Sequence, residues 1–255
     1  MTQLVDRLWP APATDLPLDA AFLDSPPPGG LDRPWVATNM VSSVDGRAQL
    51  AGTAEGLGSR VDRRLMQAYR AAFDAVGSGV GTLRADDFYS RLADDLAASR
   101  ADAGRSAQPL ALVVAGSGPV PTDRRWFGYA DQRRIVAVGS DSPHAMGSGR
   151  MAGVETWVAP SADPEPAWLL ERLAGEGIGS LLLEGGPTLN AAFLAAGLLD
   201  ELFWTIGPRI VANDALPILA ATDLPGPVEG RLLSVHRHGD ELYLRYRIGA
   251  GSIGP

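Results

Sequence analysis

The chain has 255 residues, 45% of them hydrophobic and 20% charged, which is typical of a globular protein with one large domain or two small ones. Its formal net charge of −8 argues against a nucleic-acid-binding surface, because basic faces bind phosphate backbones. The absence of cysteine excludes disulfides, thiolate metal sites and a cysteine nucleophile.

The N-terminal sequence shows no basic region followed by an apolar core, and no stretch reaches the roughly 18 to 20 apolar residues of a membrane span. We therefore expect a cytoplasmic protein that does not bind a membrane. Residues 1–33 contain many prolines and a Gly29-Gly30 pair, which predicts an extended or loosely helical arm. A single domain is expected over residues 34–255.

Short apolar runs alternate with amphipathic segments through this domain. A first strand is predicted at 35–43, and Ser59 is predicted to cap a helix at 61–73. The next strand, 74–82, ends in glycines and completes a parallel crossover. The later predicted elements are strands at 110–115, 134–138, 154–158, 181–183 and 201–206, helices at 168–174 and 189–196, and a hairpin of 232–236 with 242–248. This order predicts an α/β fold with a mixed, mostly parallel sheet flanked by helices and a C-terminal antiparallel hairpin.

The most informative stretch runs from Leu181 to Asn190, where a buried-strand pattern stops at Glu184-Gly185-Gly186 and a helix starts at Pro187. Glycines leave backbone N–H groups uncovered at the positive end of that helix, which favours a phosphate. Glu184 would stand beside it, at the carboxyl end of a strand, where open α/β sheets bind ligands. A tight turn with purely structural glycines is an equally good interpretation of this stretch alone.

Two further segments carry weaker signals. The glycine-rich segment 77–82 ends in Thr82, whose hydroxyl can donate to a phosphate or ribose oxygen, and Asp86 follows as a ribose ligand or a helix cap. It does not match the dinucleotide spacing G-x-G-x-x-G. Asp45-Gly46-Arg47 after the first strand is by itself an ordinary turn. Arg70 on the first helix faces either solvent or the pocket.

These motifs occur in the order of one family. Ser43–Arg47, 74–87, Glu184–Leu189 and Leu198–Leu202 resemble the C-terminal reductase domain of the bifunctional riboflavin-biosynthesis deaminase-reductases, which has the dihydrofolate-reductase fold. The resemblance covers residues 33–248. The chain is similar to a stand-alone member, because it lacks the cysteines that the zinc site of the partner deaminase domain requires.

The resemblance implies reduction of a pyrimidine that carries an aminoribose phosphate, with NADPH as hydride donor and no metal. It implies catalytic roles for Glu184 and Asp45. The substrate-binding residues that it implies are Asn39, Ala54, Arg70, Arg91 and Glu184. The cofactor-binding residues that it implies are Val41, Gly56, Ser59, Gly81, Thr82, Asp86, Ser117, Gly185, Gly186, Pro187, Thr188, Leu189 and Asn190.

The chain departs from the family pattern in the expected substrate pocket. The family commonly has a lysine where this chain has Asn39, and the serine and tryptophan of the following loop are replaced within 53–57. Three hypotheses therefore follow: a reductase of 5-amino-6-(5-phosphoribosylamino)uracil or a similar pyrimidine, a dihydrofolate (pterin) reductase, or a non-catalytic NADPH-binding protein. The resemblance also implies a homodimer, and a small heterocycle rather than a nucleic acid as the partner.

Overall fold

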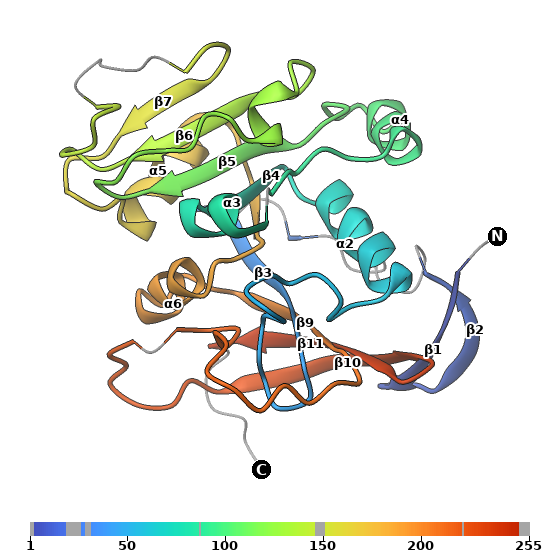
Figure 1. The fold of residues 1–255 in the computed structure, drawn as a ribbon. Helices are drawn as coiled ribbons and strands as arrows, with labels where there is room; N and C mark the ends of the chain where they lie inside the picture. The colour runs from blue at the N-terminus through green and yellow to red at the C-terminus, as the bar shows by residue number, and fades with distance from the viewer. Residues whose placement is uncertain are drawn as a thin grey trace.

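The computed structural model describes residues 3–18, 27–28, 32–86, 88–145, 151–220 and 222–249. Within these ranges, eleven strands form one sheet with the order β2-β1-β10-β11-β9-β3-β8-β4-β5-β6-β7 (Figure 1). The strands are β1 (Leu4–Trp9), β2 (Ala13–Pro17), β3 (Trp35–Ser42), β4 (Ala75–Gly79), β5 (Leu110–Ala115), β6 (Arg134–Val138), β7 (Glu155–Val158), β8 (Ser180–Leu183), β9 (Glu201–Ile206), β10 (Gly230–His238) and β11 (Glu241–Ile248).

The sheet has a parallel part and an antiparallel part that meet at β9. From β9 through β3, β8, β4, β5 and β6 to β7, each neighbouring pair is parallel. From β9 through β11, β10 and β1 to β2, each pair is antiparallel. This arrangement confirms the predicted mixed, mostly parallel sheet with a C-terminal hairpin.

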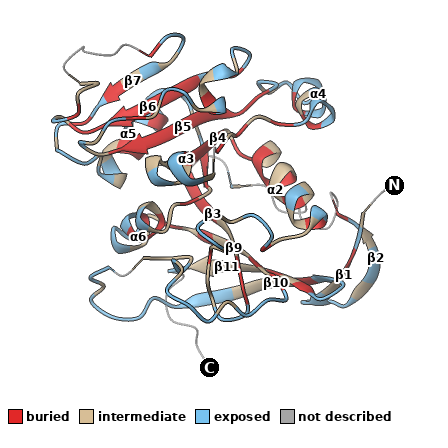
Figure 2. Cartoon of the chain, viewed as in Figure 1, coloured by how far each residue is buried: buried red, intermediate tan, exposed pale blue. Residues whose placement is uncertain are grey.

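Helices cover both faces of the parallel part. Leu169 and Leu173 of α5 and Phe193 of α6 pack against one face, beside Leu181 and Leu183 of β8. On the other face, α2 packs against β9 and β11 and α3 packs against β4 and β5. The helices are α2 (Arg60–Ala72), α3 (Val80–Asp86), α4 (Asp94–Asp102), α5 (Pro166–Gly175) and α6 (Pro187–Ala195), with a 3-10 turn at Arg125–Gly128. The sheet between them is buried (Figure 2), which explains the continuous apolar runs of its strands.

The start of α2 matters most for the site. Ser59 caps this helix, because its hydroxyl accepts the backbone N–H groups of Val61 and Asp62. The same hydroxyl donates to Glu241 of β11 at 2.6 Å. Tyr69, two turns on, stacks on Phe203 of β9 with ring centroids 4.2 Å apart. The helix is therefore held against the antiparallel strands at both points.

The N-terminal segment differs from the predicted arm. Residues 4–9 and 13–17 form β1 and β2, which extend the same sheet beyond β10. Val5 is buried, and Asp6 pairs with Arg237 of β10 at 3.0 Å. The prolines at 10 and 12 lie in the turn between the strands, where the missing N–H costs no ladder hydrogen bond. The predicted extended or loosely helical arm therefore contains two paired strands. Residues 19–26 and 29–31 of the predicted arm lie outside the described residues.

In the part of the chain that the structure describes, no helix is long and apolar enough to cross a membrane.

Candidate active site

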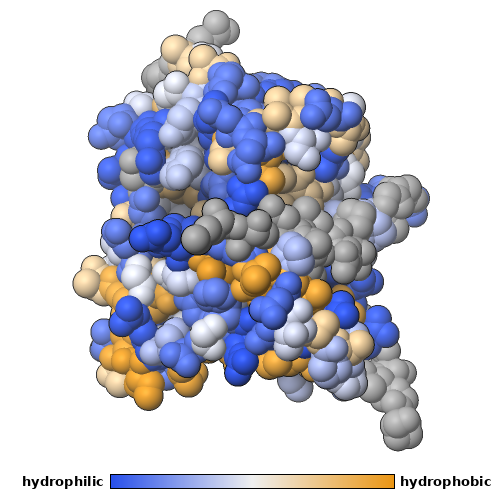
Figure 3. All heavy atoms as spheres, turned by 90° about the vertical axis from the view of Figure 1, so that its right-hand side faces the viewer, coloured by the Kyte–Doolittle hydropathy of each residue, from blue (hydrophilic) through white to orange (hydrophobic). Residues whose placement is uncertain are grey.

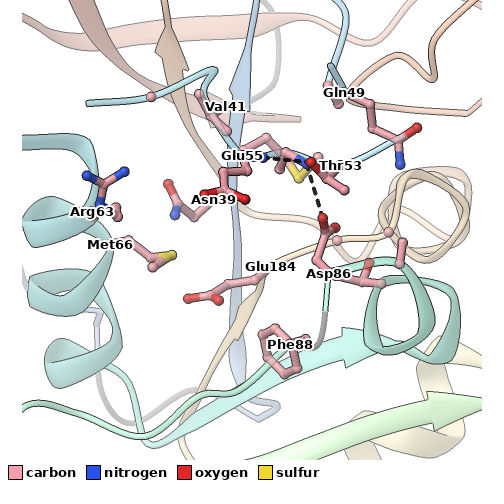
Figure 4. Close-up of a pocket in the computed structure, with 18 of the residues that line it drawn as sticks. Asn39, Val41, Gln49, Thr53, Glu55, Arg63, Met66, Asp86, Phe88 and Glu184 are labelled. Atoms are coloured by element: carbon pink, nitrogen blue, oxygen red, sulfur yellow. Dashed lines mark hydrogen bonds between the residues drawn. The ribbon is translucent and has the colours of Figure 1, made fainter. Parts of the chain in front are cut away.

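A cleft of about 780 Å³ opens at the carboxyl ends of β3, β4 and β8, between α2 and the starts of α3 and α6 (Figure 4). This is the edge of the parallel sheet where α/β proteins bind ligands. Its described lining residues come from six separate parts of the chain. They are Asn39, Met40 and Val41; Ala48, Gln49, Thr53, Ala54, Glu55, Gly56 and Gly58; Asp62, Arg63, Met66 and Arg70; and Thr82, Ala85, Asp86, Phe88 and Tyr89. Arg124 and Glu184 to Pro187 complete the wall.

The turn from β8 to α6 brings backbone close to α3. Gly185 has a φ of +87°, which only glycine adopts without strain, and its carbonyl accepts the N–H of Gly79 at 2.8 Å. A Cβ at Gly186 would lie 3.2 Å from the hydroxyl oxygen of Thr82. The space beside Gly186 therefore exists because that residue has no side chain. Both glycines border the cleft.

The N-terminus of α6 lies in this wall, and among the described residues no side chain caps it. Gly186 is its N-cap and offers no side-chain acceptor, so the N–H groups of the first turn are not capped by this residue's own side chain. Asn190 is fully buried one turn into the helix. Among the described residues, neither polar atom of its amide has a hydrogen-bond partner. Uncapped donors at a helix start, beside a glycine-lined gap, suit the phosphate of a dinucleotide.

Arg70 and Glu184 form a buried ion pair at the base of the cleft. The Arg70 Nε donates to Oε1 of Glu184 at 2.6 Å, and Nη2 donates to Oε2 at 2.6 Å. The side chains are 3% and 6% exposed, so the guanidinium holds the carboxylate in one orientation, away from bulk water. The third nitrogen of Arg70, Nη1, has no hydrogen-bond partner within the described chain. Glu184 keeps acceptor capacity for a ligand, since a carboxylate offers about four lone-pair sites.

Asp86 joins α3 to the loop that follows β3. Its carboxylate accepts the backbone N–H of Ala54 at 3.1 Å, and Thr53 accepts the N–H of Glu55 at 3.3 Å, as Figure 4 shows. Partial burial raises the pKa of Asp86. The loop over 53–56 is therefore fixed to the α3 side of the cleft.

Asp62 stands in the first turn of α2, on the opposite side. Burial raises the pKa of Asp62 to about 6. The Thr205 hydroxyl opposes this shift, because it donates a hydrogen bond that favours the ionised carboxylate. Its carboxyl group lies against Gly58, where a Cβ would come 2.1 Å from Oδ2. Nearby, Glu241 accepts hydrogen bonds from the Ser59 and Tyr243 hydroxyls, both at 2.6 Å.

The sequence analysis did not identify Asp62 as a site residue. An acidic residue in a first helical turn is common, because it complements the helix dipole. The one available signal was its position three residues after the cap Ser59, on the helix that carries Arg70.

The structure brings together most of the predicted site residues, although no bound ligand tests their roles. Those that border the cleft are Asn39, Val41, Ala54, Gly56, Arg70, Thr82, Asp86, Glu184, Gly185, Gly186 and Pro187. Those that do not are Asp45, Ser59, Gly81, Arg91, Ser117, Thr188, Leu189 and Asn190. Of the second set, Ser59, Gly81 and Thr188 are each next in sequence to a lining residue, and Leu189 and Asn190 follow Thr188 in the first turns of α6. Ser117 is an exposed residue after β5, and Asp87 lies outside the described residues.

Asp45 and Arg91 are directed elsewhere, contrary to the prediction. Asp45 accepts the Ser43 hydroxyl at 2.6 Å and the N–H groups of Val211 and Ala212 at 3.0 and 2.9 Å. These hydrogen bonds lower the pKa of Asp45 and tie the β3 turn to the loop after β9. Arg91 pairs with Asp131 at 2.9 Å and with Asp94 at 3.3 Å. Both side chains are engaged in holding loops together.

Comparison with known proteins agrees with this architecture. The RibD C-terminal domain model matches residues 34–243. A 2,5-diamino-6-ribosylamino-4(3H)-pyrimidinone 5′-phosphate reductase of Methanothermobacter thermautotrophicus is 29% identical over 85% of this chain and 99% of its own length. Riboflavin biosynthesis protein RibD of Escherichia coli is 27% identical over 71% of this chain, which spans half the length of that relative. A pyrimidine reductase-like protein of Corynebacterium diphtheriae superposes with a TM-score of 0.75 at 20% identity, covering 84% of this chain and 92% of its own. The chain therefore belongs to the RibD C-terminal domain family.

Proposed function

We propose that this protein is an NADPH-dependent reductase of riboflavin biosynthesis that acts on a ribosylaminopyrimidine 5′-phosphate. The observation that carries the proposal is the cleft itself. It has a glycine-lined, uncapped helix start on one wall and the buried Arg70–Glu184 pair at its base. The family, and the activity for which the archaeal relative is named, support the same reaction class.

A nicotinamide dinucleotide fits the α6 side of the cleft. The Gly186 gap admits a phosphate against backbone, the N–H groups at the start of α6 supply donors, and the Thr82 hydroxyl lies beside both. When bound, the reduced cofactor supplies a hydride. Val41 and Asn39 on β3 would border the nicotinamide and the substrate, because they line the stretch between the phosphate site and α2.

The Arg70–Glu184 pair would orient the substrate ring. The guanidinium holds Glu184 in one orientation at a site shielded from water, and the remaining lone pairs of that carboxylate suit the N–H edge of an aminopyrimidinone. Holding the ring in one pose lowers the barrier, because the reacting carbon is presented at a fixed distance and angle.

Two substrates of this class differ at C2 of the pyrimidine, which carries an amino group in one and an oxo group in the other. The archaeal relative is named for a 2,5-diamino pyrimidinone, and it matches this chain along nearly its whole length. RibD relatives are about twice as long as the segment they share with this chain. We propose the 2,5-diamino compound, which has not been deaminated, as the preferred substrate.

The test compares three substrates under the same conditions. NADPH oxidation is measured with the 2,5-diamino pyrimidinone, with its deaminated 5-amino uracil counterpart, and with dihydrofolate. We expect turnover with the first compound at a higher kcat/KM than with the second, and none with dihydrofolate. Turnover on dihydrofolate alone would replace the proposal with a pterin reductase. Tight NADPH binding without any turnover would indicate a non-catalytic binding protein.

We also propose that the protein works as a homodimer in the cytoplasm. Apolar, half-buried side chains of β9 and β11 form a ladder on the face of the sheet opposite α2. Hydrophobic residues also gather at the height of these strands in the side view of Figure 3, whereas the upper half is mostly hydrophilic. The ladder pairs are Leu242 with Ile206, Leu244 with Trp204, and Tyr246 with Leu202.

Light scattering after gel filtration tests the dimer. The unaltered chain should be a dimer. The Leu244→Glu variant, which has a charge in the middle of the ladder, should be a monomer with unchanged secondary structure. Val228→Glu, at an exposed loop position, is the matched control. A monomeric unaltered chain, or a Leu244→Glu variant that stays dimeric, would contradict the proposal.

A further inference from the structure

The reaction proposed above consumes a proton as well as a hydride. In a ribosylamine, C1′ has the oxidation level of an aldehyde, whereas a pyrimidinone rich in amino groups is a poor hydride acceptor. The hydride forms a new C–H bond at C1′, the bond from C1′ to the ribose ring oxygen breaks, and that oxygen takes up one proton. The exocyclic nitrogen stays bonded to C1′. Atoms and charge balance only if the site supplies this proton.

Few groups of this chain can supply it. All 22 basic residues counted as lysine or arginine are arginine, so the chain has neither a lysine nor a cysteine to act as an acid. None of the three histidines lines the cleft. Arginine does not release its proton in proteins. Among the described residues, the acids that remain in the lining are one phenol, Tyr89, and four carboxyl groups.

Three of those carboxyl groups are unsuited to the task. Both oxygens of Glu184 accept hydrogen bonds from the guanidinium of Arg70, so this carboxyl group is committed to the buried ion pair. Asp86 lies at the α3 wall, where it accepts the Ala54 N–H beside the expected cofactor site. Glu55 is exposed to solvent. Tyr89 faces the guanidinium of Arg125 at 3.9 Å and that of Arg70 at 5.6 Å, and phenols are weak acids near neutral pH.

Asp62 has a different setting. The Ser59 cap fixes the start of α2, the missing side chain of Gly58 makes room for the carboxyl group, and the Thr205 hydroxyl of β9 orients it. The carboxyl group is half-buried and lines the cleft beside β3, on the wall opposite the Thr82 side. Among the described residues, no arginine forms an ion pair with it.

We propose that Asp62 is the proton donor of this reductase and delivers its proton to the ribose ring oxygen of the substrate. The inference rests on the proposed function. A positioned acid of this kind contributes about 10²- to 10⁴-fold to a rate.

The charges around Asp62 are consistent with a carboxyl group that holds a proton near neutral pH. The carboxyl groups of Glu241 on β11 and Glu184 after β8 raise its pKa together with burial, and Arg63 on α2 and the Thr205 hydrogen bond oppose them. Tyr69 on α2 and Tyr243 on β11 face it as neutral hydroxyls, and burial raises the pKa of both. The balance lies at about 6, close to the working pH of a general acid.

The experiment measures single-turnover hydride transfer from NADPH to the 2,5-diamino pyrimidinone between about pH 5 and about pH 9. In the unaltered protein the rate should fall as pH rises through the pKa of the donor. Asp62→Asn should lower the rate by about 10²- to 10⁴-fold and remove this pH dependence, with NADPH affinity changed less than about twofold. Asp62→Glu should retain the pH dependence at a reduced rate.

Two further measurements separate a proton donor from a structural residue. Asp95→Asn removes a carboxylate from the surface of α4, where it pairs with Arg64 of α2, and should leave the rate and pH profile unchanged. Carbon NMR of aspartate-labelled protein without ligands should show one carboxyl group titrating near pH 6, which Asp62→Asn removes and Asp95→Asn retains.

The outcomes distinguish the two proposals. If the unaltered protein turns over none of the pyrimidines, the proposed function fails and this inference fails with it. If it turns over the 2,5-diamino compound while Asp62→Asn retains the rate and the pH profile, the inference alone is overturned. If the rate of Asp62→Asn falls only because its NADPH affinity falls, Asp62 belongs to cofactor binding, and the proton-donor inference is again overturned.

Discussion

Replacing Arg70 by methionine should destabilise the whole protein, because Glu184 would remain buried without its counter-ion. Both oxygens of that carboxylate now accept hydrogen bonds from one guanidinium at 2.6 Å, and neither side chain is more than 6% exposed. Methionine approximates the apolar stem of arginine, so the change removes charge and donors more than volume.

The magnitude follows from the burial of the pair. Removing one partner of a buried ion pair costs about 3–5 kcal/mol, since the remaining charge keeps its desolvation penalty. For a chain of this size, each kcal/mol lowers Tm by roughly 2–4 °C, so we expect a decrease of about 6–20 °C. The double variant Arg70→Met, Glu184→Gln leaves no buried charge and should recover most of this loss.

Urea unfolding followed by circular dichroism measures the free energy of unfolding of both single variants, the double variant and the unaltered protein. Arg64→Met is the matched control on the same helix, because its partner Asp95 is 61% exposed, and it should cost less than about 1 kcal/mol. Arg70→Met with a cost as small as the control, or two single effects that simply add in the double variant, would refute the reasoning.

Three further predictions address the same cleft. Glu184→Gln should lower kcat far more than NADPH affinity, as measured by steady-state kinetics and fluorescence titration, and an equal loss of both would place Glu184 at the cofactor instead. Gly186→Val should weaken NADPH binding first, because its Cβ would already stand 3.2 Å from the Thr82 hydroxyl; unchanged affinity would contradict a phosphate at that gap. Asp62 should make stability fall as pH rises from about 4 to about 6, because ionisation is disfavoured in the folded state, with a pKa of about 6 against 3.8 unfolded. Asp62→Asn should therefore be more stable above pH 6 by up to about 3 kcal/mol and show no such gain near pH 4, whereas an unaltered pH slope of unfolding would exclude this assignment.

The parallel part of the fold was predictable because its strands are buried on both faces. Residues 110–115 and 135–138 are continuous apolar runs, and the structure has strands at Leu110–Ala115 and Arg134–Val138. The short helices α3 and α4 were not predicted. The first begins inside a glycine-rich segment, and the second has no apolar stripe at helical spacing. β1 and β2 depend on pairing with β10, which no local pattern reveals.

The part of the cleft that is built from a distinctive motif was predictable from the sequence. The part that depends on single acidic residues was not, because such residues are common throughout the chain. Glycines directly before a helix that starts with proline indicate a place where a ligand can approach the backbone closely. Gly185 and Gly186 do border the cleft. Asp45 resembles a site residue in sequence, yet its carboxylate accepts two N–H groups from a loop more than 160 residues further along the chain. Such long-range partners decide which acidic residue reaches the cleft, and only the fold supplies them.

The position of β3 in the sheet has a consequence for how the protein is made. This strand leaves the ribosome early, but its neighbours β8 and β9 lie at residues 180–183 and 201–206. At roughly 5–20 residues per second, about 8–30 s of synthesis separate β3 from its second neighbour, and during that time the backbone N–H and C=O groups along its edges have no native partner. The wall that carries Asp62 packs on β9 and β11, so it forms later still. A nascent chain that has not yet added the C-terminal hairpin therefore already contains Gly185 and Gly186, but it lacks a strand against which α2 packs.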